Sequence, residues 1–147
     1  MNEVNNLSDN LTSLVGTFLG ASYSVLKHKY EVEKNFVKGG SKKYGVIPRD
    51  INEIPGATCF ITLEQGFEVI ISDTYKTITT GDSPKDNAVK NLKDLGLDLY
   101  VEIVNLKANS PSIVMNIDEF NSTIEELDED KLIINRITFT IQYRKSK

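Results

Sequence analysis

Apolar residues change their spacing several times along this 147-residue chain, and the order of those changes constrains the fold more than any single residue. A helical spacing of three or four opens the chain, and β-rich runs follow at residues 57–75. A second helical stretch covers residues 84–107, and two more β-rich runs come after it. Because such elements bury their apolar sides against each other, the pattern predicts an α+β fold. The expected order is α-β-β-α-β-β, a mostly antiparallel sheet packed against a long N-terminal helix and a central helix.

The opening helix is predicted over residues 3–33. Its apolar stripe keeps intervals of three or four residues, through Val4, Leu7, Leu11, Leu14, Phe18, Ser22, Leu26 and Tyr30. Gly16 and Gly20 lie within this stripe, and each weakens a helix by about 1 kcal/mol relative to Ala. We expect a bend or a tight contact with the sheet there. The alternatives are packing on a neighbouring subunit, or two shorter helices broken near Gly20.

Residues 38–56 have the composition of a linker, with glycines, prolines and charges of both signs. Long loops inside a small domain are uncommon and are often functional. The segment Gly39-Gly40-Ser41-Lys42 lacks the spacing of a phosphate-binding loop. We therefore predict a solvated arm that becomes ordered on a partner.

A β-hairpin is predicted next, with strands at residues 57–63 and 67–75. Glu64-Gln65-Gly66 would form its loop, with the glycine adopting a positive φ angle. Ile70 interrupts the polar face of the second strand, so we expect a partner to cover part of that face.

The central helix begins with a strong signal, Asp82-Ser83-Pro84, and Asp86 adds negative charge to its first turn. Helical spacing then holds for Val89, Leu92, Leu95, Leu99, Ile103 and Leu106. One long helix is the preferred interpretation. The alternative ends the helix at Gly96 and makes residues 97–105 a strand.

The last third of the chain contains two predicted strands, at residues 112–117 and 132–143. From Ile137 the second strand alternates strictly between apolar and polar residues. The acidic residues 118–130 between them include Phe120, Ile124 and Leu127 at helical spacing, and we expect a solvated face or a polar surface between subunits. The basic residues 144–147 are expected to fray.

Composition limits the function classes. The net charge is −4 and the pI is near 5.1, whereas a nucleic-acid-binding domain usually has a basic face. The first residues lack the features of a signal peptide, and no apolar run approaches the roughly 18 residues of a membrane span. We expect no membrane association and no specific DNA binding.

Few residues suggest chemistry, since the chain has one His and one Cys. His28 lies between two lysines and is expected on the surface. Cys59 has apolar neighbours and is expected as a buried structural thiol, with a reactive thiol as the alternative. The acidic run lacks the glycine of a helix–loop–helix calcium site. No catalytic, cofactor-binding or metal-binding residue is assigned, and we expect neither an enzyme nor a cofactor.

The length favours one domain over residues 1–147. Its expected parts are an N-terminal helix in residues 1–37, a long loop or arm in residues 38–56, and a sheet with a central helix in residues 57–147.

The layout of residues 57–144 resembles that of small phage tail-terminator (tail-completion) proteins. The likeness rests on two segments, FEVIISDTY at residues 67–75 and ITFTIQYR at residues 137–144. The resemblance implies a homo-oligomeric ring, expected to be a hexamer, that caps the tail tube and joins it to the head connector. It implies no catalytic residues. The opening helix and the loop before the hairpin depart from the family's layout.

The resulting expectation is a structural virion protein at the phage head–tail junction, made in the host cytoplasm. Its partners would be copies of itself, the tail tube and connector or neck proteins, with DNA passing through the channel without specific binding. The alternatives are another neck or tail-tube component, or a small non-viral α/β binding module.

Overall fold

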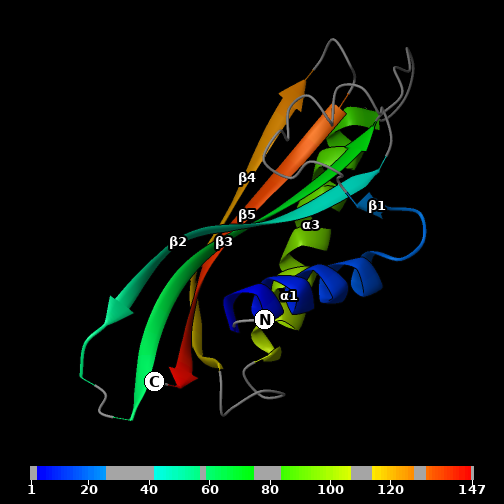
Figure 1. Cartoon of the computed structure of the whole chain (residues 1–147). Helices are drawn as coiled ribbons and strands as arrows, with labels where there is room; N and C mark the ends of the chain where they lie inside the picture. The colour runs from blue at the N-terminus through cyan, green and yellow to red at the C-terminus, as the bar shows by residue number, and fades with distance from the viewer. Residues whose placement is uncertain are drawn as a thin grey trace.

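In the part of the chain that the structure describes, five strands form one mixed sheet, and the helices α1 and α3 lie on one of its faces (Figure 1). The computed structural model describes residues 3–25, 42–56, 59–74, 84–106, 114–127 and 132–146. The elements follow the order α1 (Glu3–Leu19), β1 (Ser24–Val25), β2 (Lys43–Ile54), β3 (Phe60–Thr74), α3 (Pro84–Val104), β4 (Val114–Leu127) and β5 (Leu132–Ser146). This confirms the α+β class and corrects the predicted order, because three strands rather than two precede α3.

The sheet runs β1-β2-β3-β5-β4. The pairing of β1 with β2 is parallel, and the pairings β2–β3, β3–β5 and β5–β4 are antiparallel. The strands β2 and β4 therefore run in opposite directions and form the two long outer strands of the described sheet.

The N-terminal helix is shorter than predicted, because α1 ends at Leu19. Gly20 follows with a φ angle of 84°, and its amide donates to the Gly16 carbonyl at 3.0 Å, which closes the last helical turn. A Cβ atom on Gly16 would lie 3.2 Å from the Cζ atom of Tyr44 on β2. The Gly16–Gly20 step thus combines a tight contact with the sheet and a helix end. Residues 26–33 of the predicted helix lie outside the described residues.

The predicted hairpin within residues 57–75 is wrong. Phe60–Thr74 is one strand, β3, with Gln65 and Gly66 paired to β5 in its middle. The hairpin partner of β3 is β2, which occupies most of the segment predicted as an arm. Figure 1 shows the far end of this β2–β3 hairpin curving away from α1.

The central helix is confirmed as one element, α3, which begins at Pro84 with Asp86 in its first turn. The strand alternative for residues 97–105 is wrong. Gly96 is buried within the helix because the side chains of Asn135 and Ile137 occupy the space of a Cβ atom there. Because Gly96 has no side chain, α3 can approach β5 closely at this position, and the helix continues past it.

The described part of the acidic segment, residues 118–127, is strand rather than a helical stripe, since β4 extends from Val114 to Leu127. The last strand is confirmed and is longer than predicted, because β5 continues through Ser146, which pairs with Phe60. Residues 144–146 are therefore part of the sheet rather than a frayed tail.

The main core lies between the helices and the sheet. Its fully buried side chains come from α1, α3 and the inner strands, and include Leu11, Leu99, Phe67, Phe139 and Tyr143. A second apolar cluster, of Ile47, Ile70, Leu132 and Ile134, lies on the opposite face of the sheet. The chain itself buries these four side chains to 1% exposure or less, so Ile70 does not require the partner that the sequence suggested.

Candidate functional site

The two outer strands leave main-chain groups along open edges of the sheet. The short β1 pairs only with Lys43 and Tyr44 of β2, so in the described part no strand lies beside the rest of that edge. The strand β4 is paired to β5 on one side, and no described strand lies on its other side. Such edges are templates for pairing with another chain.

Both outer strands contain a bulge at the same height in the sheet. The register of β2 shifts between Pro48 and Ile51, and that of β4 shifts between Asp118 and Asn121. Pro48 pairs with Phe67, which pairs with Phe139, and the β4 bulge lies opposite Phe139. Glu119, inside the β4 bulge, has a φ angle of 59°. Bulges bend a strand and increase its local twist, and they are a feature of sheet edges.

The β4 edge is acidic. Its side chains include four carboxylates and no basic group: Asp118, Glu119, Glu125 and Glu126. Asp118 accepts a hydrogen bond from Asn116 Nδ2 at 2.8 Å, and Glu119 accepts one from Thr140 Oγ1 at 2.9 Å. Because these two donors are neutral, they leave the negative charge of Asp118 and Glu119 uncompensated.

A row of alternating charges crosses the face of the sheet opposite the helices, one residue from each of four strands. Arg49 of β2 binds Glu68 of β3, Arg136 Nη1 of β5 binds Glu68 at 2.9 Å, and Arg136 Nε binds Glu125 of β4 at 2.6 Å. We call this row the charge ladder. Glu68 is only 6% exposed, so both of its basic partners matter for its charge.

The charge ladder fixes the protonation state of Glu68. Burial alone raises the pKa of Glu68, but the hydrogen bonds and positive charges of Arg49 and Arg136 outweigh it and hold the pKa below its usual value. Through these ion pairs, the charge ladder links the outer strands β2 and β4 to the central strands β3 and β5.

Two buried polar side chains on the helix face were missed by the sequence analysis. Asn135 is fully buried; its Nδ2 donates to the Leu92 carbonyl at 3.1 Å, and its Oδ1 accepts from Ser122 at 2.7 Å. Gln65 accepts a hydrogen bond from the Tyr143 hydroxyl at 3.2 Å. The available signal was Asn135 itself, a polar residue in an otherwise apolar run. Its bonds join α3, β4 and β5.

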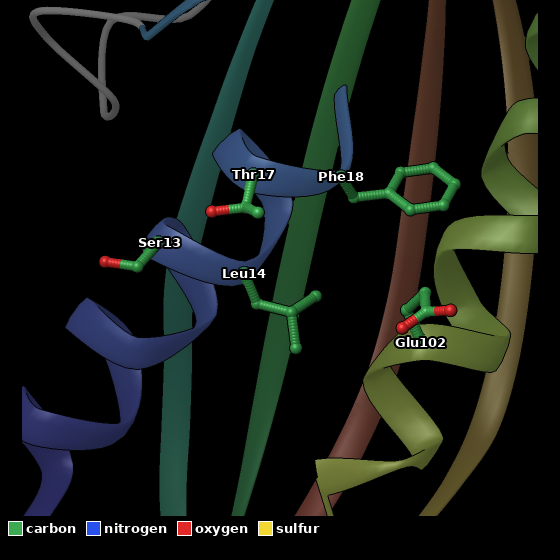
Figure 2. A pocket seen from close by; sticks show the side chains of 5 residues that line it. All are labelled: Ser13, Leu14, Thr17, Phe18 and Glu102. Carbon is green, nitrogen blue, oxygen red and sulfur yellow. The ribbon is translucent and has the colours of Figure 1, made fainter. Parts of the chain in front are cut away.

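A groove of about 310 Å³ lies between the two helices. Ser13, Leu14, Thr17 and Phe18 of α1 and Glu102 of α3 line it. Figure 2 shows Leu14 and Phe18 reaching from α1 toward α3, and the Glu102 carboxylate on the opposite wall. An apolar floor with one carboxylate suits an apolar group that carries a hydrogen-bond donor or a positive charge.

A second hollow of about 300 Å³ lies between α3 and β4. Its lining mixes both signs of charge, with Asp86, Val89, Lys90, Lys93 and Asp94 from α3 and Glu126 from β4. Three carboxylates stand there beside two lysines, so the lining carries charges of both signs with a small acidic excess.

The structure corrects several expectations for single residues. Cys59 is exposed rather than buried, because it lies in the connection between β2 and β3. Lys43 begins β2 instead of belonging to an arm. His28, Gly39, Gly40, Ser41 and residues 128–130 of the acidic run lie outside the described residues.

The described residues contain no group of three or more His, Cys, Asp or Glu side chains placed to hold a metal ion. None of the helices in the described ranges has the length and apolarity needed to cross a membrane. No protein-family model matches the sequence, and no curated protein matches it significantly.

Proposed function

We propose that this chain is a structural subunit of a phage head–tail junction, which assembles into a closed ring that terminates the tail tube and joins it to the connector. The observation that carries this proposal is the pair of open, dissimilar sheet edges on β2 and β4. A ring needs two different surfaces on each subunit, because head-to-tail contacts close into rings. The phage assignment rests on the resemblance of residues 57–144 to tail-terminator proteins.

The channel of such a ring must let DNA pass without binding it. The net charge of −4 supplies repulsion rather than phosphate contacts. This charge suits a subunit whose partners are proteins, namely copies of itself, the tail tube and the connector.

The proposal is tested by the mass of the purified protein across a concentration series, measured by light scattering with negative-stain images of the same samples. We expect closed rings of about six subunits. Their mass would be about 99 kDa, six times the 16.5 kDa of one chain. A protein that remains monomeric at every concentration would contradict self-assembly.

The same images separate the terminator from other neck and tail-tube components. A terminator ends growth, so single rings are expected. Stacks of rings that extend into tubes would instead assign the chain to the tail tube itself.

The groove between α1 and α3 favours a second candidate, a small binding module. The apolar Leu14 and Phe18 beside the Glu102 carboxylate suit a cationic ligand with an apolar body. This candidate predicts that an aromatic or aliphatic amine raises the melting temperature of the protein, and that Glu102→Gln abolishes the shift. Because Glu102 is exposed, the variant should fold normally.

A further inference from the structure

The exposed large apolar side chains of the described residues gather at the two sides of the sheet. Leu97, Val101 and Val104 of α3 are 54%, 55% and 38% exposed, and Val25 and Ile51 are 51% and 42% exposed. We define the β4 flank as the open edge of β4 with Leu97, Val101 and Val104, and the β2 flank as the open edge of β2 with Val25 and Ile51. We propose that the β4 flank of one copy docks on the β2 flank of the next copy. This inference rests on the proposed function and names the contact between its subunits.

The apolar part of the β4 flank is a stripe on one side of α3. Leu97, Val101 and Val104 are spaced by four and three residues, so they share a helix side. Tyr100, in the same stretch of α3, packs on Phe120 of β4 with ring centroids 4.3 Å apart. Leu97 and Val104 lie three residues before and four residues after Tyr100, so the stripe adjoins Tyr100 on the solvent-exposed side of α3 that leans toward β4.

The apolar part of the β2 flank lies on the same face of the sheet as the helices. Val25 pairs with Tyr44, and Ile51 pairs with Gln65. Directly paired residues share a face. Tyr44 packs against the main core and Gln65 bonds the buried Tyr143, so their partners Val25 and Ile51 also face the helical side. Two copies side by side thus bring apolar side chains together in their helical layers.

The strand directions permit the same contact in the sheet layer. The strands β2 and β4 run in opposite directions. A second copy in the same orientation therefore places its β2 antiparallel to β4 of the first. Pairing across this junction would satisfy main-chain groups that both edges leave open, as in strand addition.

The charges favour this contact over pairing of two identical edges. The β4 strand carries four carboxylates and no basic group, whereas residues 42–54 carry three basic and two acidic groups. Through the sheet register, the bulge that holds Arg49, beyond the part of β2 that β1 covers, lies level with the bulge that holds Glu119. Two β4 edges facing each other would oppose like charges, which destabilises a pair of strands. The contact is therefore head-to-tail.

Two variants and their mixture test the inference. Val101→Glu disrupts the β4 flank, and Ile51→Glu disrupts the β2 flank. The matched controls introduce the same carboxylate at exposed sites away from both flanks, with Asn91→Glu on α3 and Asn10→Glu on α1. Circular dichroism melts establish that each variant folds, and light scattering gives its mass. Val25→Glu is a second β2-flank variant in case Ile51→Glu does not fold.

We expect each flank variant alone to have the 16.5 kDa mass of one chain, while the controls assemble like the wild type. An equimolar mixture of the two variants should form pairs of about 33 kDa, because one undamaged flank of each kind remains. Flank variants that assemble like the wild type, or a mixture that stays single while the wild type forms rings, would overturn the inference and leave the proposed function standing. A wild-type chain that never assembles overturns both.

Discussion

At the scale of residues, positions with little or no freedom for substitution hold the helices on the sheet. Gly96 is buried where α3 crosses β5, and the side chains of Asn135 and Ile137 occupy the space beside it. Asn135 in turn donates to the Leu92 carbonyl one turn earlier in α3. This small set of residues positions α3 more specifically than general apolar burial does.

We expect Gly96→Ala to destabilise the protein by about 1–2 kcal/mol, because overpacking outweighs the helix propensity that alanine gains. The new Cβ atom would lie 2.9 Å from Ile137 Cδ1 and would displace the Asn135 side chain. Urea unfolding measures the change. Asn91→Ala, at an exposed position of the same helix, is the control and should be neutral or slightly stabilising. Equal stability of Gly96→Ala and the wild type would contradict the packing described for α3.

The charge ladder predicts a pH dependence. Because the pKa of Glu68 is lowered from 4.5 in the folded protein, its stabilising contribution is complete above pH 4.5 and is lost as the pH falls through the folded value. We expect Glu68→Gln to reduce the free energy of unfolding near pH 7 by about 1–3 kcal/mol. The difference from the wild type should shrink as the pH drops below about 4.5.

Denaturant melts at a series of pH values measure this difference. Glu64→Gln, on the same strand and face, is the matched control, and its smaller effect should reflect one side-chain hydrogen bond to Gln142. A constant offset between Glu68→Gln and the wild type at all pH values would argue against a role for the Glu68 charge.

At the scale of elements, sequence periodicity predicted α3 and β5 because each element buries one face and leaves the other face more exposed to solvent. The buried side of α3 repeats at helical spacing through Leu92, Leu99 and Ile103. In β5 the core-facing residues alternate strictly from Ile137 onward. One buried face and one wetter face produce a clear period, which a single sequence reveals.

The strand β2 and the larger part of β4, after Ile117, were missed for the opposite physical reason. Much of β2 and β4 is solvent-exposed at a sheet edge, so charges and a proline are tolerated there. The β4 bulge also breaks the period of two, placing Ile117 and Phe120 on one face although they are three residues apart. Together with Ile124, these residues mimic helical spacing. The open edges, and with them the candidate site, could not be located without the strand order.

The continuity of β3 can be tested by an insertion. One alanine inserted between Gln65 and Gly66 would shift the following residues by one position and turn Phe67, Val69 and Ile71 away from the core. We expect the cooperative thermal transition to disappear. The control is the same insertion between Pro55 and Gly56, in the connection from β2 to β3, which should be tolerated. Equal tolerance of both insertions would favour a loop at residues 64–66.

At the scale of the whole molecule, the two sides of the sheet carry different sets of charged side chains. One side of the sheet ends in β4, with four carboxylates and no basic group, and the other ends in the short β1 and in β2, which carries charges of both signs. The helices lie on one face, so the open edges remain the places where the sheet can extend.

If opposite charges help the subunits meet, assembly should weaken with salt. We expect the dissociation constant of the ring to rise several-fold as NaCl increases from about 0.05 M to 1 M, where the screening length falls to about 3 Å. Analytical ultracentrifugation across this range measures it. Potassium sulfate is the comparison salt, since it screens charge but strengthens apolar contacts. Assembly that is unchanged or tighter in NaCl would mean that apolar contacts, rather than charges, hold the subunits together.

The paired bulges at the level of Phe67 and Phe139 have a geometric consequence for such a ring. Each bulge changes the direction in which its strand leaves the sheet. When β2 of one copy continues from β4 of another, the sum of the two bends fixes the angle between successive copies. The number of subunits that completes a full circle is then a property of the backbone, while the side chains decide only which surfaces meet. Removing one bulge would change the circumference of the ring without changing its chemistry.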